Sequence, residues 1–353
     1  APGRRPHIIP RGMGGRPGEG VRCAVPPALR LGASFKQVSD RLTLARWMVS
    51  EDSPTTARIL ANRYAQRIFG RGFIPTPDDL GVRGTRPTHP ALLDWLAAEL
   101  RESRWNLRAF LRLLVTSQTY RRDSSERAEL SARDAQNLLL ARGHRVRLDA
   151  EVLRDQASFA SGLLVDELGG PPVFPYHPDG IYEAINDAVG DLTTYRPDRD
   201  TRRIHRRAMY SFWRRATLLP SLSLLDAPLR IYGTARRDET NTPTQALAIL
   251  NEPFFVESAR TLAERARREA PGDIDRQIEQ VIRHVLGRRA RPDEVAVARQ
   301  SYDAELLELR GTADPQRLLC IGEASFDAAG DAAAQAAMTL VARAVLSRSE
   351  ALH

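Results

Sequence analysis

The sequence predicts a mainly α-helical fold, a bundle-like assembly of several helices with a few short strands and a long loop rich in proline and glycine. Two observations predict the helices. Apolar residues recur every three or four positions along most of the chain, and residues that typically start or stop helices flank these periodic stretches. A third observation predicts the loop, because residues 171–203 contain several prolines and little apolar periodicity.

Composition limits the class of protein. The chain has 353 residues, 42% of them hydrophobic, and a mean hydropathy of −0.38, which suits two or three soluble globular units. No apolar run reaches the roughly 20 residues that cross a bilayer, so we expect no membrane span. The net charge of +8 comes from arginine, since Lys36 is the only lysine. Acidic residues are interspersed among the arginines, whereas a nucleic-acid binder gathers its basic residues on one face, and a nucleic-acid partner is therefore not expected.

The pattern divides the chain into four parts. They are an extended N-terminal arm at 1–35, a helical subdomain at 36–170, a loop-rich segment with short strands at 171–235, and a C-terminal helical subdomain at 236–353. The chain opens APGRRPHIIPRG, with no charged and then apolar leader, and we expect a processed or excised fragment.

The first helices are predicted from their end residues. Ser53 is the expected N-cap of a helix that has Pro54 at its first position and Gly70 as its stop. A second helix is expected after Thr88, and Asn106 is the expected cap of a third. These helices share the spacing of an apolar stripe that packs on a neighbour.

Further along the chain, Asp149 is expected to cap a helix that ends before the Gly-Gly-Pro-Pro run at 169–172. Alternating aromatic and small residues permit a short strand within 202–220, and a second extended segment is expected at 231–237. From Thr242 onward the pattern is helical again.

The densest run of hydrogen-bonding side chains is RRDETNTPTQALAILN at 236–251. Thr242, Pro243 and Gln245 match a capping box, with a hydroxyl at the N-cap, proline at the first helical position and glutamine at the third. The preceding arginines either pair with Asp238 and Glu239 or hold an anion at the helix start. The candidate anion- or ligand-binding residues of the chain are Arg58, Arg63, Arg147, Arg154, Arg236, Arg237 and Asn241.

Two carboxylates are the candidates for catalysis. Glu151 and Asp155 lie one helical turn apart, and with Arg237 they would form an acid–base site. The alternative is a helix face on which arginines neutralise the acids. No nucleophile-elbow, zinc-protease, phosphate-loop or dinucleotide-binding motif occurs, so whether the chain is an enzyme stays open.

Metal and disulfide chemistry have weaker support. The loop residues His177, Asp179 and Glu183, with Asp187 further on, are weak metal candidates, and because their spacing matches no known metal loop, no metal is predicted. The two cysteines, Cys23 and Cys320, lack zinc or haem-attachment spacing, and we expect two isolated, buried thiols.

The order of these motifs resembles the family catalogued as domain of unknown function 1553, a planctomycete-type domain. The similar blocks are LARWMVSEDSPTTARILANRYAQRIFG and its continuation to LLDWLA, RVRLDAEVLRDQASFASGLL, RRAMYSFWRRATLLPSLSLLDAP, RRDETNTPTQALAILNEPFFVESARTLAERA, VIRHVLGRRARPDE, and GEASFDAAGDAAAQAAMTLVARAVL. The matching polar positions are Arg58, Asn62, Arg63, His89, Asp94, Trp95, Arg147, Glu151, Arg154, Asp155, Arg237, Gln245 and Asn251.

This chain also departs from the family pattern. Tyr64 stands where a tryptophan is usual, Leu111 where a histidine is usual, and Leu229 where an acid is usual. Losing the histidine and the acid counts against acid–base chemistry here.

The resemblance implies a setting more than a reaction. Family members look exported, and they often follow a cytochrome-c-like region and a second domain of unknown function. We therefore expect a periplasmic or otherwise extracytoplasmic protein that acts as a non-catalytic scaffold and docks a cytochrome-type or cell-surface protein partner. No cofactor is expected in this chain, and a haem would belong to a partner or an upstream domain. The alternatives are an extracytoplasmic enzyme acting on a glycan or related polymer and, on charge alone, a basic nucleic-acid-binding protein.

Overall fold

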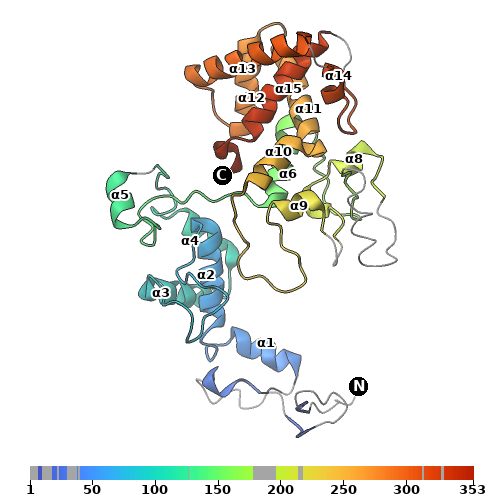
Figure 1. Ribbon diagram of the computed structural model, residues 1–353. Coiled ribbons are helices and arrows are strands. Elements are labelled where there is room, and N and C mark those ends of the chain that lie inside the picture. The colour runs from blue at the N-terminus through green and yellow to red at the C-terminus, as the bar shows by residue number, and fades with distance from the viewer. Residues whose placement is uncertain are drawn as a thin grey trace. The chain divides into compact units, whose positions relative to one another are not determined.

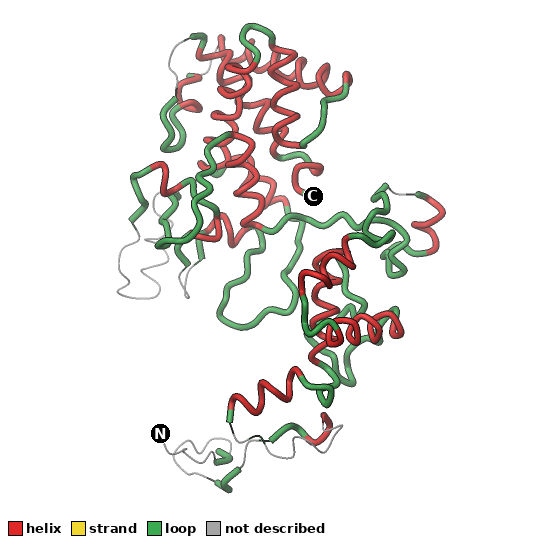
Figure 2. The backbone as a smooth tube through the Cα atoms, turned by 180° about the vertical axis from the view of Figure 1, so that it is seen from behind, coloured by secondary structure: helices red, strands yellow, loops and turns green. Residues whose placement is uncertain are grey.

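The computed structural model describes residues 7–9, 18–21, 24–29, 38, 40–125, 127–177, 196–213, 218–311, 314–326 and 330–353 (Figure 1). The chain is mainly helical, as the sequence predicts, and it forms two compact units, Ala1–Arg145 and Val146–His353. Within the described ranges, strand pairing is limited to three isolated bridges, and Figure 2 shows only helices and loops.

The first unit is built around a small group of helices. In chain order its elements are η1 (Pro27–Leu29), α1 (Arg41–Val49), α2 (Thr56–Phe69), α3 (Pro90–Glu102), α4 (Leu107–Val115) and α5 (Ala128–Arg133). Helices α2, α3 and α4 pack on one another around a core that includes Leu93, Leu100 and Phe110.

A buried asparagine fastens the loop after α2. The side chain of Asn62 accepts from the Ile74 N–H at 2.8 Å and donates to the Ile74 carbonyl at 3.3 Å. Gly72 lies so close that a Cβ atom there would stand 2.7 Å from Asn62 Oδ1. The loop therefore needs glycine at this position, and it brings Phe73 into the core.

The second unit contains most of the helices. They are α6 (Ala150–Ser161), α8 (Thr201–Ile204), η2 (Ala208–Tyr210), α9 (Pro220–Leu224), α10 (Pro243–Asn251), α11 (Pro253–Glu269), α12 (Ile274–Leu286), α13 (Pro292–Gly311), α14 (Pro315–Leu319), α15 (Ala332–Leu346) and η3 (Ser349–Leu352). Helix α11 packs against α6, α12 and α15, and α15 also packs against α13 (Figure 1).

Helix α11 is buried on every side along most of its length. Its buried residues include Phe254 and Leu262, but also Glu257, Arg260 and Glu264. A helix in such a position is normally apolar all round, so each buried charge must have a partner within the fold.

Local signals for helix ends hold at several positions. Gly70 ends α2 in the left-handed conformation, with φ of 73°, Asn106 accepts from the Ala109 N–H at 3.1 Å, and Thr242 and Gln245 form the complete capping box. Two expected starts differ. Helix α2 begins at Thr56, because the Ser53 hydroxyl bonds the Thr56 side chain at 2.9 Å instead of capping a helix. Asp149 makes no side-chain cap, and its carboxylate lies 3.7 Å from the guanidinium of Arg237.

The middle of the chain also differs from the expected pattern. Helix α6 ends at Gly162, earlier than the glycines at 169–170, and it belongs to the second unit because it packs on α11 and α12. In the described part of 202–220, residues 202–213 and 218–220, the expected strand is reduced to single bridges from Arg206 to Val165 and from Ser211 to Val173. The reason is local: Asp200 accepts from the Arg202 N–H and starts a short helix there. The segment at 231–237 is an irregular loop.

Candidate functional site

Helix α6 carries two of the three candidate catalytic residues, Glu151 and Asp155, and the third, Arg237, pairs with Glu151. Arg237 donates from Nη1 and Nη2 to the two carboxylate oxygens of Glu151, at 2.6 and 3.2 Å. Burial opposes the charge of Arg237, but the hydrogen bonds and the negative charge of Glu151 raise its pKa above the usual value. This two-point pair matches guanidinium and carboxylate geometry. The pair occupies both groups, and the partner of Arg237 is Glu151, a different acid from the expected Asp238 and Glu239.

A second network closes the loop between α9 and α10. Asp226 accepts from the Thr240 N–H at 2.7 Å, from the Thr240 hydroxyl at 2.8 Å and from the Gln245 amide at 3.0 Å. Arg147 donates to the Gln245 side-chain oxygen at 2.6 Å and to the Thr240 carbonyl. Gln245 thus caps its own helix and also joins α10 to the segment before α6. The neck of the loop, from Asp226 to Thr240, is held by side chains on both sides.

The other candidate carboxylate, Asp155, stands apart from the Glu151–Arg237 pair. It accepts from the Ala208 N–H at 2.6 Å, which ties α6 to η2. Burial raises the pKa of Asp155, while the Ala208 hydrogen bond and nearby Arg207 act in the opposite direction. A raised carboxyl pKa suits a general acid, but the backbone hydrogen bond gives this carboxylate a structural role.

Arg154, on the same helix, is buried and stacks over the ring of Phe254, with 3.5 Å between guanidinium carbon and ring centroid. Its Nη2 makes no hydrogen bond within the described part of the chain. The contact is a cation–π pair inside the core of the second unit.

The remaining candidates are scattered. Arg58 pairs with Asp94 at 3.2 Å on exposed helix faces of the first unit, and Arg63, Arg236 and Asn241 are exposed. His177 is half-buried, whereas Asp179, Glu183 and Asp187 lie outside the described residues. Among the described residues, no three His, Cys, Asp or Glu side chains are placed to hold a metal ion. The anion candidates fall in both units, with Arg58 and Arg63 in the first and Arg147, Arg154, Arg236, Arg237 and Asn241 in the second.

Cys320 also differs from the expectation. It is a free thiol, but it is exposed, at the end of the short helix α14, where we expected a buried one. Cys23 lies outside the described residues.

The sequence pattern missed a buried polar cluster around Glu257 on α11. His205 Nε2 lies 3.0 Å from Glu257 Oε2, and the Tyr176 hydroxyl donates to the same oxygen. The other oxygen, Oε1, accepts from the N–H groups of Glu323 and Ala324, at 2.7 and 2.5 Å. Burial alone would raise the pKa of Glu257, but the hydrogen bonds from His205, Tyr176 and Ala324 lower it overall. The cluster joins α11 to three segments that are distant in the sequence, those of Tyr176, His205 and residues 323–324.

Arg260, one turn along α11, completes this attachment. It donates to Glu264 at 2.9 Å and to the Ala324 carbonyl at 2.7 Å. Gly322 adopts φ of +99°, and a Cβ atom there would meet the Glu257 side chain at 2.6 Å. Residues 322–326, which read GEASF, therefore pack against α11 and hydrogen-bond its buried charged side chains. The spacing of Glu257, Arg260 and Glu264 at i, i+3 and i+7 was the available signal, because it places three charges on one face of an apolar helix.

The capping box gives a direct test of the α10 start. Changing Thr242 to alanine should cost about 1 kcal/mol, because the Gln245 N–H loses its side-chain acceptor. For a unit of this size that is a fall of roughly 2–4 °C in melting temperature. Thr244→Ala, an exposed threonine in the same turn, is the matched control. Equal melting of the two variants would contradict the assignment.

No helix in the described ranges is long and apolar enough to cross a membrane. Comparison with protein families finds a match over residues 40–302 to the model described as PSD1, protein of unknown function (DUF1553). Comparison with curated proteins finds no match, and comparison with solved structures finds none. The matched region includes α2 to α4 of the first unit and, in the second, the α6 start, the loop neck and three members of the Glu257 cluster, Tyr176, His205 and Glu257. The other two members, Glu323 and Ala324, lie beyond it.

Proposed function

The chain belongs to the PSD1 family of unknown function (DUF1553), and on that premise we propose that it is a non-catalytic interaction domain. The proposal places it outside the cytoplasm, where it docks a cytochrome-type redox protein or a cell-surface protein. The setting and the partner class come from the family resemblance. The sequence has no CxxCH haem-attachment motif, so in this proposal a haem belongs to the partner or to an upstream domain.

The observation that carries the proposal is how the polar family residues are used. Glu151 and Arg237 occupy each other, Asp155 holds a backbone amide, and Arg147 and Gln245 close the loop neck. A catalytic acid or base needs a lone pair or proton that faces the substrate. These residues instead shape the protein, which supports a binding role over the glycan-degrading alternative.

The loop that they fasten presents apolar side chains to solvent. We call residues 229–236 the docking loop; it is the tip of the long loop between α9 and α10 (Figure 2). Leu229, Ile231 and Tyr232 are 47%, 49% and 71% exposed. Exposed apolar and aromatic residues in one short segment mark protein interaction sites. The fastened neck reduces the ordering entropy that such a loop loses on binding.

The charge of the docking loop indicates the kind of partner surface. It contains Arg230 and Arg236 and no acidic residue. The Arg230 guanidinium lies 3.7 Å from the ring centroid of Trp213, which holds that end of the loop. We infer a protein partner with an apolar patch that is bordered by acidic side chains, because opposite charges around an apolar centre guide docking.

The test is a binding comparison with a docking-loop variant. The full chain would be used to capture partners from an extracytoplasmic fraction, and the recovered protein would then be purified and its affinity measured directly. Ile231→Ser with Tyr232→Ser should weaken that affinity by about tenfold or more, because buried aromatic anchors often contribute about 2 kcal/mol or more. Added salt should weaken it further.

Leu307→Ser is the matched control, since Leu307 is exposed on α13. It should leave the affinity unchanged, and both proteins should melt with the wild type. Recovery of no reproducible partner, or an affinity that the loop variant does not alter, would refute the proposal. Retention that nuclease treatment abolishes would favour the nucleic-acid alternative instead.

A further inference from the structure

We propose that the first unit contains a binding site for a phosphate or sulfate group, formed by Arg71, Ser124, His144 and Arg145. This site is separate from the docking loop and does not depend on the function proposed above.

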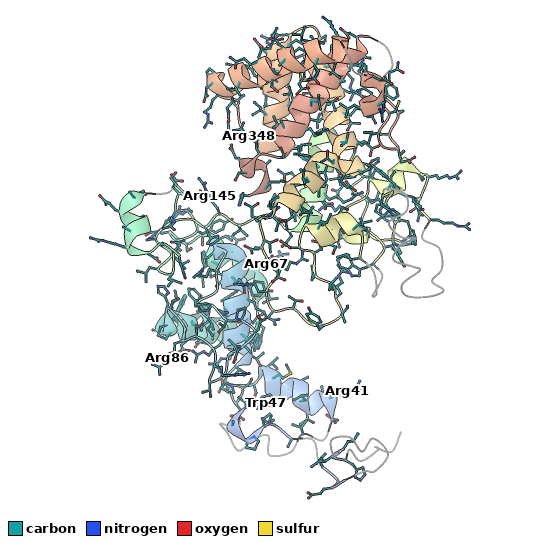
Figure 3. All side chains as sticks on the ribbon, viewed as in Figure 1. Arg41, Trp47, Arg67, Arg86, Arg145 and Arg348 are labelled. Carbon is teal, nitrogen blue, oxygen red and sulfur yellow. The ribbon has the colours of Figure 1, made fainter. Side chains whose placement is uncertain are left out.

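The site is a hollow of 330 Å³ between the end of α2 and the irregular segments on either side of α5. Its lining is Arg71, Ser124, Ala135, Gln136, Asn137, Arg142, Gly143, His144 and Arg145. Three of these residues are arginines and one is histidine, and no carboxylate takes part. Arg145, which is labelled in Figure 3, lies on the segment that follows α5.

The walls of the hollow are held by hydrogen bonds to backbone groups. Asn137 is buried, accepts from the Arg142 N–H at 3.2 Å and donates to the Arg142 carbonyl at 2.8 Å. Arg142 in turn donates to the carbonyls of Asp134 and Ala135, at 3.2 and 2.8 Å. The Gly143 N–H donates to the Asp123 carbonyl at 2.9 Å, which places the 142–145 segment beside Ser124. These hydrogen bonds therefore fix the shape of the hollow.

Two acids that are adjacent in the chain to lining residues direct their carboxylates elsewhere. The Asp134 carboxylate accepts from the N–H groups of Leu138 and Leu139, at 2.7 and 2.8 Å. The Asp123 carboxylate accepts from the Ser125 N–H and hydroxyl, at 3.0 and 2.9 Å. Neither carboxylate lines the hollow, so its positive charge is not neutralised from within the wall.

Several donors in the hollow are not used by the protein. Arg71 is half-buried, and together with Ser124, His144 and Arg145 it makes no side-chain hydrogen bond or ion pair among the described residues. A half-buried guanidinium without a partner is unusual, because its N–H groups lose water and gain nothing in return. An oxyanion would satisfy these donors together, and guanidinium groups match the geometry of phosphate and sulfate oxygens.

The size of the hollow indicates the class of ligand. A volume of 330 Å³ is at the lower end of small-molecule sites, which span roughly 300–1,000 Å³. It exceeds what one inorganic ion needs, since a water molecule in the liquid takes about 30 Å³. We therefore assign the site to a phosphate or sulfate monoester on a small carrier.

The experiment is calorimetric titration of the full chain at low ionic strength with inorganic phosphate, inorganic sulfate, glucose 6-phosphate and acetate. Phosphate or sulfate should bind saturably at one site. Glucose 6-phosphate should bind at least as tightly as inorganic phosphate, and weaker binding would contradict the size argument. Acetate should bind more weakly than both ions, and equal binding would contradict the assignment to a tetrahedral oxyanion. Tighter binding of inorganic phosphate would assign the site to a phosphate monoester, and tighter binding of inorganic sulfate would assign it to a sulfate monoester.

Arg71→Ala with Arg145→Ala should weaken binding by at least tenfold. The matched control is Arg63→Ala with Arg108→Ala, which removes the same charge from exposed arginines on α2 and α4 outside the hollow. An equal loss in the control would show a general charge effect and overturn the site, as would the absence of saturable binding. If the first variant fails to fold, Arg145→Glu at an exposed position must abolish binding.

Discussion

Replacing Glu257 by leucine should lower the free energy of unfolding of the Val146–His353 unit by about 3–5 kcal/mol. The leucine removes the acceptor of the Tyr176 hydroxyl, the His205 ring and the N–H groups of Glu323 and Ala324. The Tyr176 hydroxyl and the His205 ring stay buried without this acceptor, and breaking a buried pair by removing one member costs about this much. The hydrophobic gain from leucine does not offset the loss of these four hydrogen bonds.

Thermal and urea unfolding, followed by circular dichroism, would measure the loss. For a unit of this size, 1 kcal/mol corresponds to about 2–4 °C, so the melting temperature should fall by roughly 6–20 °C. Glu279→Leu, an exposed position on α12, is the control and should melt close to the wild type. Glu257→Gln should fall between the two, because it keeps one carbonyl oxygen as an acceptor. A loss below 1 kcal/mol for the leucine variant would contradict the role assigned to the cluster.

The sequence predicts what depends on neighbouring residues. The capping box at Thr242, the Asn106 cap and the Gly70 stop each involve residues within one helical turn, and the apolar spacing of α11 and α15 predicts two buried helices. The resemblance to the family also precedes the structure, because it needs only the order of the motifs.

What the sequence does not predict depends on residues that are distant in the chain. Asp149 is a plausible N-cap from its sequence position. Its carboxylate instead lies near the guanidinium of Arg237, which pairs with Glu151. The choice between an acid–base site and a structural pair at Glu151 could not be made without knowing that Arg237 reaches it. The Glu257 cluster joins residues 81 and 52 positions apart, and no local pattern indicates which polar residue a buried helix faces.

The loops of the second unit connect the fold to the proposed role. In the second unit, the polar side chains that match the family pattern hold loops to helices. The apolar side chains of the docking loop are exposed to solvent. In the proposed docking role, the tip of the loop would set the choice of partner while the neck holds the loop in place. Leu229, where the family resemblance implies an acid, lies in that tip.

Replacing Glu294 by glutamine should lower the stability of the same unit by about 2 kcal/mol at neutral pH. Glu294 is only 4% exposed and accepts from Arg288 at 2.8 Å, from Arg348 at 2.9 Å and from the Arg291 N–H at 2.9 Å. Arg348, labelled in Figure 3, follows α15, so the carboxylate joins the loop before α13 to the C-terminal end. The three arginines are 30–61% exposed, and water screens part of each interaction, which keeps the effect below that of a fully buried pair.

The pH dependence separates this role from simple packing. Hydrogen bonds from Arg288, followed by those from Arg291 and Arg348, hold the pKa of Glu294 well below its usual value of 4.5. A carboxyl whose pKa is lower in the folded state than in the unfolded state stabilises the fold above the unfolded pKa, and this contribution is lost as the pH falls. The wild type should therefore lose more stability than Glu294→Gln between about pH 5 and pH 3, and the two unfolding curves should converge in acid. Glu279→Gln, at an exposed position, should keep the wild-type slope. A difference in unfolding free energy between wild type and Glu294→Gln that stays constant across that range would contradict this prediction. It would mean that the charge of Glu294 contributes nothing and that the arginines are held by packing.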